Sequence, residues 1–235
     1  MSIEENIALV RQNIARAAAQ VGRVPGEITL VGASKMNDAD ACRAAIAAGI
    51  DALGENRVQE MTQKLAENAY DGAPLHFIGH LQRNKVKMVV GKVALIESVG
   101  SYELLSMIDA QADKLGIVQD ILLEVNTGGE SSKSGFAPAE ISAALADAAA
   151  FSSIRVRGLM TIPPICTSGA ENLPYFRLLE QLFIDNCEKK YDNVRMDFMS
   201  MGMSGDYEAA IACGANMVRV GTAIFGQRVY PAGSD

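Results

Sequence analysis

The chain opens with a segment in which apolar residues recur at helical spacing. They are Ile3, Ile7, Val10, Ile14 and Val21, with polar residues between them. Ser2 followed by Glu5 has the form of a capping box, and Gly22 and Pro25 come just after the periodic stretch. The pattern predicts an amphipathic helix over residues 2–21.

Eight short β-prone runs follow, and most are apolar throughout. They cover residues 28–34, 51–54, 75–79, 94–99, 120–126, 156–162, 196–201 and 217–221. Stretches of helical length separate them, at residues 38–48, 57–68, 84–90, 102–115, 138–150, 171–190 and 207–213. Apolar runs are typical of strands buried on both faces, and strict alternation of strand and helix indicates a parallel sheet.

Eight strand–helix units predict a closed (β/α)8 barrel, the TIM-barrel fold, with an extra N-terminal helix. The alternative is an open doubly wound sheet, but the turn after the first strand, GASKMND, lacks the GxGxxG of dinucleotide-binding proteins. No linker or break in composition divides the sequence. We therefore expect a single domain over residues 1–235.

Composition and charge limit the cellular locations and the kinds of binding partner that we expect. The net charge of −7 argues against extensive electrostatic binding to nucleic acid or to an anionic membrane. No stretch reaches the roughly 20 apolar residues of a membrane span, and the acidic N-terminus does not resemble a secretory signal. The cysteines form no CxxC pair: Cys42, Cys166, Cys187 and Cys213. A reduced, cytoplasmic location is the simplest expectation.

Lys35 is the sharpest candidate for chemistry because it ends an apolar first strand. In this fold reactive groups lie at the carboxyl ends of the strands. A lysine there can lose its proton by desolvation and attack a carbonyl to form a Schiff base. The alternative, favoured for a lysine considered alone, is a solvated side chain at a strand-to-loop junction.

The ends of the last two strands favour a phosphate site. Ser200 offers a hydroxyl, and Gly221-Thr222 offers a backbone N–H and a second hydroxyl. Loops after strands seven and eight often bind phosphate in such barrels, and residues 222–225 could form a short helix whose amides face the anion. Arg219 lies inside the predicted barrel, where it needs a partner, and a structural ion pair is an equally good interpretation.

Two histidines and one basic segment carry weaker signals. His76 and His80 are four residues apart, but the spacing shows no third ligand for zinc. We expect one at the start of a strand and the other at the barrel mouth. The basic segment 83–92 is interpreted as a solvated helix face.

Six segments resemble the pyridoxal phosphate homeostasis protein family (YggS-like), itself similar to the barrel domain of alanine racemase. They are LVGASKMNDAD (30–40), GENRVQE (54–60), HFIGHLQRNK (76–85), VNTGGESSKSGF (125–136), RGLMTI (157–162) and MSMGMSGDYEAAIACGANMVRVGTAIFG (199–226). The resemblance runs nearly the whole chain. One departure is Gly100, where family members often have an aspartate.

The resemblance implies a role for each matching position. Lys35 matches the lysine that carries pyridoxal 5′-phosphate as a Schiff base, and Arg219 matches an arginine near the pyridine nitrogen. The phosphate cradle matches Ser200, Gly221 and Thr222, and further cofactor-binding positions match Asn56, His80 and Met199. The resemblance implies no metal.

The expected function is to hold and deliver pyridoxal phosphate without efficient catalysis. An arginine at the ring nitrogen does not give up its proton, so it weakens the ring as an electron sink. Alanine racemase resembles this arrangement and still works, but it brings a tyrosine base from a second domain, for which we expect a chain ending at Asp235 to leave no room. The alternatives are a slow amino-acid racemase and, less favoured, a Schiff-base aldolase. We expect a monomer, with pyridoxal-phosphate-dependent apoenzymes as candidate partners.

Overall fold

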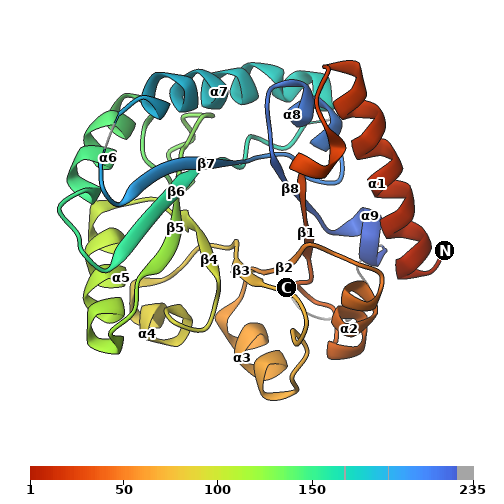
Figure 1. The fold of residues 1–235 in the computed structure, drawn as a ribbon, viewed down its shortest axis with the longest axis horizontal. Coiled ribbons are helices and arrows are strands. Elements are labelled where there is room, and N and C mark those ends of the chain that lie inside the picture. The colour runs from red at the N-terminus through yellow and green to blue at the C-terminus, as the bar shows by residue number, and fades with distance from the viewer. Residues whose placement is uncertain (167, 190, 227–235) are drawn as a thin grey trace.

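The chain forms a closed parallel barrel ringed by helices, as predicted. The structure is a computed structural model that describes residues 1–166, 168–189 and 191–226. Neighbouring strands pair in chain order from β1 to β8, and β8 pairs with β1 to close the barrel (Figure 1). The strands are β1 Thr29–Ala33, β2 Ala52–Glu55, β3 Leu75–Phe77, β4 Leu95–Val99, β5 Gln119–Glu124, β6 Ile154–Met160, β7 Val194–Ser200 and β8 Met217–Val220.

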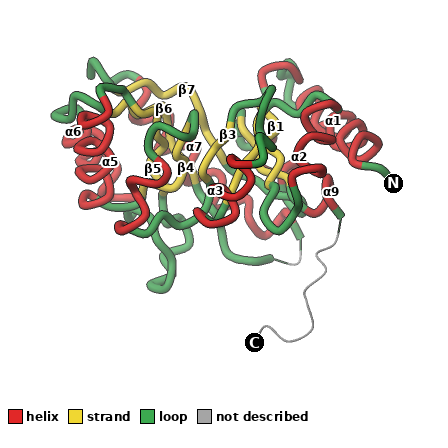
Figure 2. Tube along the Cα trace, turned by 90° about the horizontal axis from the view of Figure 1, so that it is seen from below, coloured by secondary structure: helices red, strands yellow, loops and turns green. Residues whose placement is uncertain are grey.

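Helices alternate with the strands and cover the outside of the barrel. They are α1 Ile3–Gln20, α2 Ala39–Ala47, α3 Val58–Ala66, α4 Val86–Val89, α5 Tyr102–Leu115, α6 Ile141–Ala148, α7 Leu173–Cys187, α8 Tyr207–Ala212 and α9 Thr222–Phe225. Figure 2 shows the yellow strands enclosed between α5 and α6 on one side and α1 and α2 on the other. The predicted extra helix is α1, and it packs against α8, α9 and α2.

Local sequence signals account for several helix ends. Ser2 and Glu5 form the predicted capping box at the start of α1. Two predicted helices begin as 3₁₀ turns, at residues 138–140 and 169–172, before α6 and α7. The predicted helix over 84–90 is a 3₁₀ turn, Arg83–Lys85, followed by the short α4. The predicted end of the segment 171–190, at Lys190, lies outside the described residues.

Two apolar layers hold the barrel. The larger layer lies between strands and helices, where fully buried side chains such as Phe77, Phe176 and Leu105 pack. The smaller layer fills the barrel interior below the mouth and consists of Val31, Ala52, Leu95, Leu122, Met160 and Met217. Each large apolar side chain removed from water contributes roughly 1.5–3 kcal/mol. The interior is thus a packed core, and the polar groups lie above it at the carboxyl ends of the strands.

No helix within the described ranges combines the length and the apolar character that crossing a membrane requires.

Candidate functional site

Closure of the barrel brings the first and last strands together at the mouth. Gly32 of β1 lies opposite Val220 of β8, so the residues that follow them reach the same edge. Gly221 approaches Ala33 closely, because a Cβ on Gly221 would lie 3.4 Å from the Ala33 Cβ. Lys35 is half-buried and lies two residues beyond Ala33. The structure therefore brings Lys35 and Gly221 to one edge.

The first turn of α9 and Ser204 form a cradle beside this edge. The Ser204 Oγ accepts hydrogen bonds from the backbone N–H groups of Gly221, at 3.2 Å, and Ala223, at 3.3 Å. Thr222 is the first residue of α9, and its side chain is exposed. N–H groups at the start of a helix together with a hydroxyl that can still donate suit an anion such as phosphate. We call Ser204 and the N–H groups of residues 221–223 the amide nest.

Ser200 lies elsewhere, fully buried inside the barrel. Its hydroxyl donates to Glu97 Oε2 at 2.6 Å and accepts from Arg219 NH1 at 2.5 Å. The side chain points inward from β7 toward β4 and β8, and its proton is donated to Glu97. The structure thus separates Ser200 from the amide nest. Ser204, which the sequence analysis did not single out, takes the predicted place beside Gly221.

Arg219 is held in the interior by several groups, as the need for a partner predicted. Its NH2 donates to the Thr161 carbonyl at 2.8 Å, and its NH1 lies 3.8 Å from Glu97 Oε2. Burial lowers the pKa of Arg219, and the charge of Glu97 is the strongest influence opposing that shift. The guanidinium is therefore fixed one layer below the mouth.

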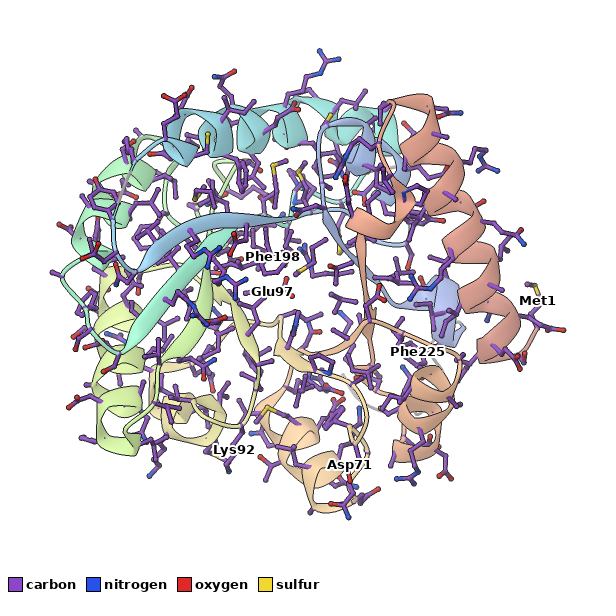
Figure 3. All side chains as sticks on the ribbon, in the orientation of Figure 1. Met1, Asp71, Lys92, Glu97, Phe198 and Phe225 are labelled. Carbon is purple, nitrogen blue, oxygen red and sulfur yellow. The ribbon has the colours of Figure 1, made fainter. Side chains whose placement is uncertain are left out.

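Glu97 links Arg219 to a buried histidine and lies inside the ring of strands in Figure 3. The Nδ1–H of His76 donates to Glu97 Oε1 at 2.7 Å. Burial favours the neutral form of Glu97, but the His76 hydrogen bond, with help from Arg219, outweighs it and lowers the pKa of the carboxyl. His76 is thus the partner of a carboxylate. Among the described residues no group of three or more His, Cys, Asp or Glu could hold a metal ion.

A cavity of about 400 Å³ opens among residues at the carboxyl ends of β2, β3, β5 and β6. Asn56 and His80, both predicted site residues, line it together with Glu124. His80 is exposed, whereas the Asn56 Oδ1 atom is buried and has no hydrogen-bond partner. A buried acceptor without a partner indicates a place for a ligand donor. The volume lies in the range of small-molecule sites.

Glu124 is a further carboxyl at this cavity, and sequence reasoning overlooked it. It accepts a hydrogen bond from the Ser134 hydroxyl at 2.9 Å. Burial raises the pKa of Glu124, although the Ser134 hydrogen bond and the charge of Arg219 oppose the shift. Its place as a charged residue within an otherwise apolar run at the end of β5 was the signal that could have identified it.

The structure does not bring Met199 to the mouth. Met199 neighbours the inward-facing Ser200 on β7, so it faces outward and joins the layer between strands and helices. Its methyl group lies against Gly214, where an added Cβ would approach it to 2.9 Å. Met199 therefore packs the barrel wall.

Gly100 has a steric explanation in this chain. A Cβ at Gly100 would lie 2.6 Å from the backbone nitrogen of Gly135 and 2.8 Å from its Cα. Backbone atoms at that distance leave no room for a side chain unless the loop moves. The loop after β4 therefore packs directly on the loop after β5.

The sequence of this chain matches those of known proteins along nearly its whole length. The family model for the alanine racemase N-terminal domain matches residues 4–229. A pyridoxal phosphate homeostasis protein of Aquifex aeolicus is 40% identical over 230 residues, covering 98% of this chain and 100% of the relative. The protein of the same name from Escherichia coli K12 is 38% identical, with 97% of each chain covered.

Solved structures agree with the barrel. PipY of Synechococcus elongatus, solved without pyridoxal phosphate, superposes with a TM-score of 0.84 at 33% identity and covers 96% of this chain and 100% of that one. PipY with pyridoxal phosphate bound gives a TM-score of 0.79 at 32% identity, with the same coverage. Alanine racemase of Clostridium difficile, at 16% identity and a TM-score of 0.71, covers 97% of this chain and 58% of that one and shows the fold alone.

Proposed function

Because this chain belongs to the pyridoxal phosphate homeostasis protein family, we propose that it holds pyridoxal 5′-phosphate on Lys35 and passes the cofactor on. The full-length relatives carry that name, and PipY has a structure with pyridoxal phosphate bound. The observation that carries the proposal is the position of Lys35 and the amide nest, which lie beyond the ends of the two adjacent strands β1 and β8. An amine and a phosphate cradle at one edge suit a phosphorylated aldehyde.

The residues at the mouth fit this ligand. When bound, pyridoxal phosphate supplies an aldehyde that a lysine amine can attack to form a Schiff base and a ring that can withdraw electrons. In our proposal Lys35 provides the amine, and the phosphate replaces the Ser204 oxygen as the acceptor for the N–H groups of Gly221 and Ala223, while the Ser204 hydroxyl donates to it. Asn56 offers its unpartnered Oδ1 to the ligand, and His80 lies at the exposed rim.

Arg219 supports a carrier rather than an efficient enzyme. The hydrogen bonds to Ser200 and Thr161 and the nearby Glu97 hold the guanidinium in place. A guanidinium donates hydrogen bonds and stays protonated, so an arginine near the ring nitrogen leaves that nitrogen without a proton. The bound ring would then be a weaker electron sink. We therefore propose that the cofactor is stored and handed to pyridoxal-phosphate-dependent apoenzymes.

The test is α-proton exchange of amino acids in deuterated water. We expect the loaded protein to exchange L- and D-alanine, serine and glutamate far more slowly than about one per second, a rate at the low end of ordinary enzymes. Exchange at or above that rate would overturn the carrier proposal in favour of a racemase. Glu124→Gln is the variant to compare with wild type. It removes a carboxyl at the cavity, the candidate for an acid–base group on the second face of the ligand.

A further inference from the structure

Helix α3 holds the backbone on both sides of Lys35 from outside the barrel. The Lys64 Nζ donates to the Ser34 carbonyl at 2.8 Å. The Met36 N–H donates to Glu60 Oε2 at 2.7 Å. Glu60 and Lys64 are four residues apart on α3, so both lie on one face of the helix. One face of α3 is therefore hydrogen-bonded to the residue before Lys35 and to the residue after it.

The turn that contains Lys35 is strained and depends on such contacts. Met36 has a φ of 62°, in the left-handed region that residues other than glycine rarely adopt. Its side chain is 39% exposed, so packing does little to fix the conformation. The Asn37 side-chain amide donates to the Lys35 carbonyl at 3.0 Å. Strained backbone persists where the surrounding contacts hold it in place, and here hydrogen bonds provide that restraint.

The Lys64 contact has a buried anchor behind the barrel wall. Lys64 is 5% exposed and pairs with the fully buried Glu55, Nζ to Oε1 2.5 Å. The same oxygen accepts from the Ser34 hydroxyl at 2.7 Å and from the Tyr70 hydroxyl at 3.2 Å. Burial, followed by the charge of Glu55, raises the pKa of Tyr70 far above its ordinary value, so the phenol keeps its proton and donates.

A buried ion pair of this kind needs an explanation beyond stability. Desolvation of two charges costs about as much as their attraction returns, and well-packed apolar residues often serve the fold as well. In this pair the Lys64 ammonium also donates a hydrogen bond to the Ser34 carbonyl, next to Lys35. Glu60 and Lys64 contact the backbone of Met36 and Ser34, so these contacts act on Lys35 through the chain.

We infer that Glu60 and Lys64 are positioning residues that hold the turn of residues 34–36 so that the Lys35 amine meets its carbonyl partner. This inference rests on the proposed function of Lys35. Displacements of about 1 Å can cost on the order of a hundredfold in the rate of a positioned reaction. Releasing either contact should therefore slow Schiff-base formation while the barrel stays folded.

Three variants and one control separate positioning from folding. Glu60→Leu removes the acceptor of the Met36 N–H, and Glu60→Gln restores a carbonyl acceptor. Glu55→Gln combined with Lys64→Met removes the ammonium group without leaving a buried charge unpaired. Gln59→Leu is the matched control, because it places leucine at the exposed neighbouring position of α3. Thermal unfolding midpoints verify that each variant is folded.

Two readouts test the inference. In the cofactor-free protein, hydrogen–deuterium exchange of the Met36 amide should be at least about tenfold faster in Glu60→Leu, but not in Glu60→Gln or Gln59→Leu. With pyridoxal phosphate, the rate of borohydride-trapped labelling of Lys35 should fall about tenfold or more in Glu60→Leu and in the double variant. Glu60→Gln should restore the labelling rate.

The two proposals fail differently. If wild-type Lys35 were not labelled at all, the proposed function would be wrong, whatever the exchange of Met36. If wild-type Lys35 were labelled and the folded Glu60→Leu and double variants were labelled equally fast, the positioning roles would be refuted. Slower labelling in Gln59→Leu as well would assign the effect to α3 in general and likewise overturn the inference.

Discussion

Ser200 and Ser204 have identical side chains and opposite surroundings. Ser200 ends β7 facing the interior, where Glu97 and Arg219 take its hydroxyl. Ser204 follows four residues later in the loop, where its oxygen meets the N–H groups of Gly221 and Ala223. We propose that the phosphate-binding role belongs to Ser204, whose hydroxyl faces the amide nest.

Ser204→Ala should therefore weaken binding of pyridoxal phosphate about tenfold or more. A hydrogen bond to a charged group contributes roughly 1.5–3 kcal/mol, and about 1.4 kcal/mol corresponds to tenfold in affinity. Binding of pyridoxal, which lacks the phosphate, should change little. Titration of the cofactor-free protein with both ligands measures the ratio. Equal losses for the two ligands, or a larger effect on the ratio from Ser200→Ala, would contradict the assignment.

Glu124 gives an expectation about pH. Burial raises the pKa of Glu124 above the ordinary 4.5, so the folded protein binds this proton more tightly than the unfolded chain does. Its contribution to stability is full below pH 4.5 and declines as pH rises through the folded-state pKa. Glu124→Gln removes this titration and keeps an acceptor for Ser134.

The unfolding free energy of Glu124→Gln relative to wild type should thus increase as pH rises from about 4.5 to neutral. Urea unfolding at several pH values gives the difference directly. A difference that stays constant or falls with pH would show that the carboxyl is not the group whose pKa burial raises.

At the scale of single residues, the sequence identified residues that lie just beyond the end of a strand. Lys35, Asn56 and Gly221 are of this kind, and the structure places all three at the mouth. Ser204 lies four residues beyond its strand, and its partners are 17 and 19 residues away in the chain. Strand ends can be located from local pattern, whereas the direction of a loop hydroxyl depends on contacts that the pattern does not contain.

At the scale of elements, helices with their own caps were predicted best. Helix α5 has the predicted bounds, because Ser101 caps its start and Gly116, in the left-handed conformation, ends it. Neither the Arg83–Lys85 turn nor α4 has a side-chain cap, and there a predicted helix of seven residues shortened to four. The contact between Gly100 and Gly135 joins two loops and was not visible from local sequence.

Gly100→Ala should test that contact. An added Cβ meets the Gly135 backbone, so the loop after β5 must shift, at a cost of roughly 1–3 kcal/mol typical of overpacking. Chemical denaturation measures the loss. Gly26→Ala is the control, because a Cβ there meets nothing within 4 Å. Equal stability of the two variants would mean that the loops are not in fixed contact.

At the scale of the whole molecule, barrel closure creates the site. Residues 35 and 221 reach the same edge of the barrel only because β8 pairs with β1. The strand order that predicts this pairing follows from the alternation of strands and helices. The sequence predicted that Arg219 needs a buried partner, but the identity of that partner could not be predicted in the same way. Glu97 interrupts an apolar strand, and its partners His76, Ser200 and Arg219 come from three other strands. Buried charges are tolerated where such partners meet, and only the closed barrel reveals that they do.

The most direct test of the account is to locate the covalent bond. The protein saturated with pyridoxal phosphate is reduced with borohydride, digested and mapped by mass spectrometry, with Lys35→Arg treated in parallel. We predict that the pyridoxyl mass appears on the peptide containing Lys35 and is lost from that peptide in the variant. A pyridoxyl group on Lys85, Lys133 or another lysine, with Lys35 unmodified, would contradict the central claim.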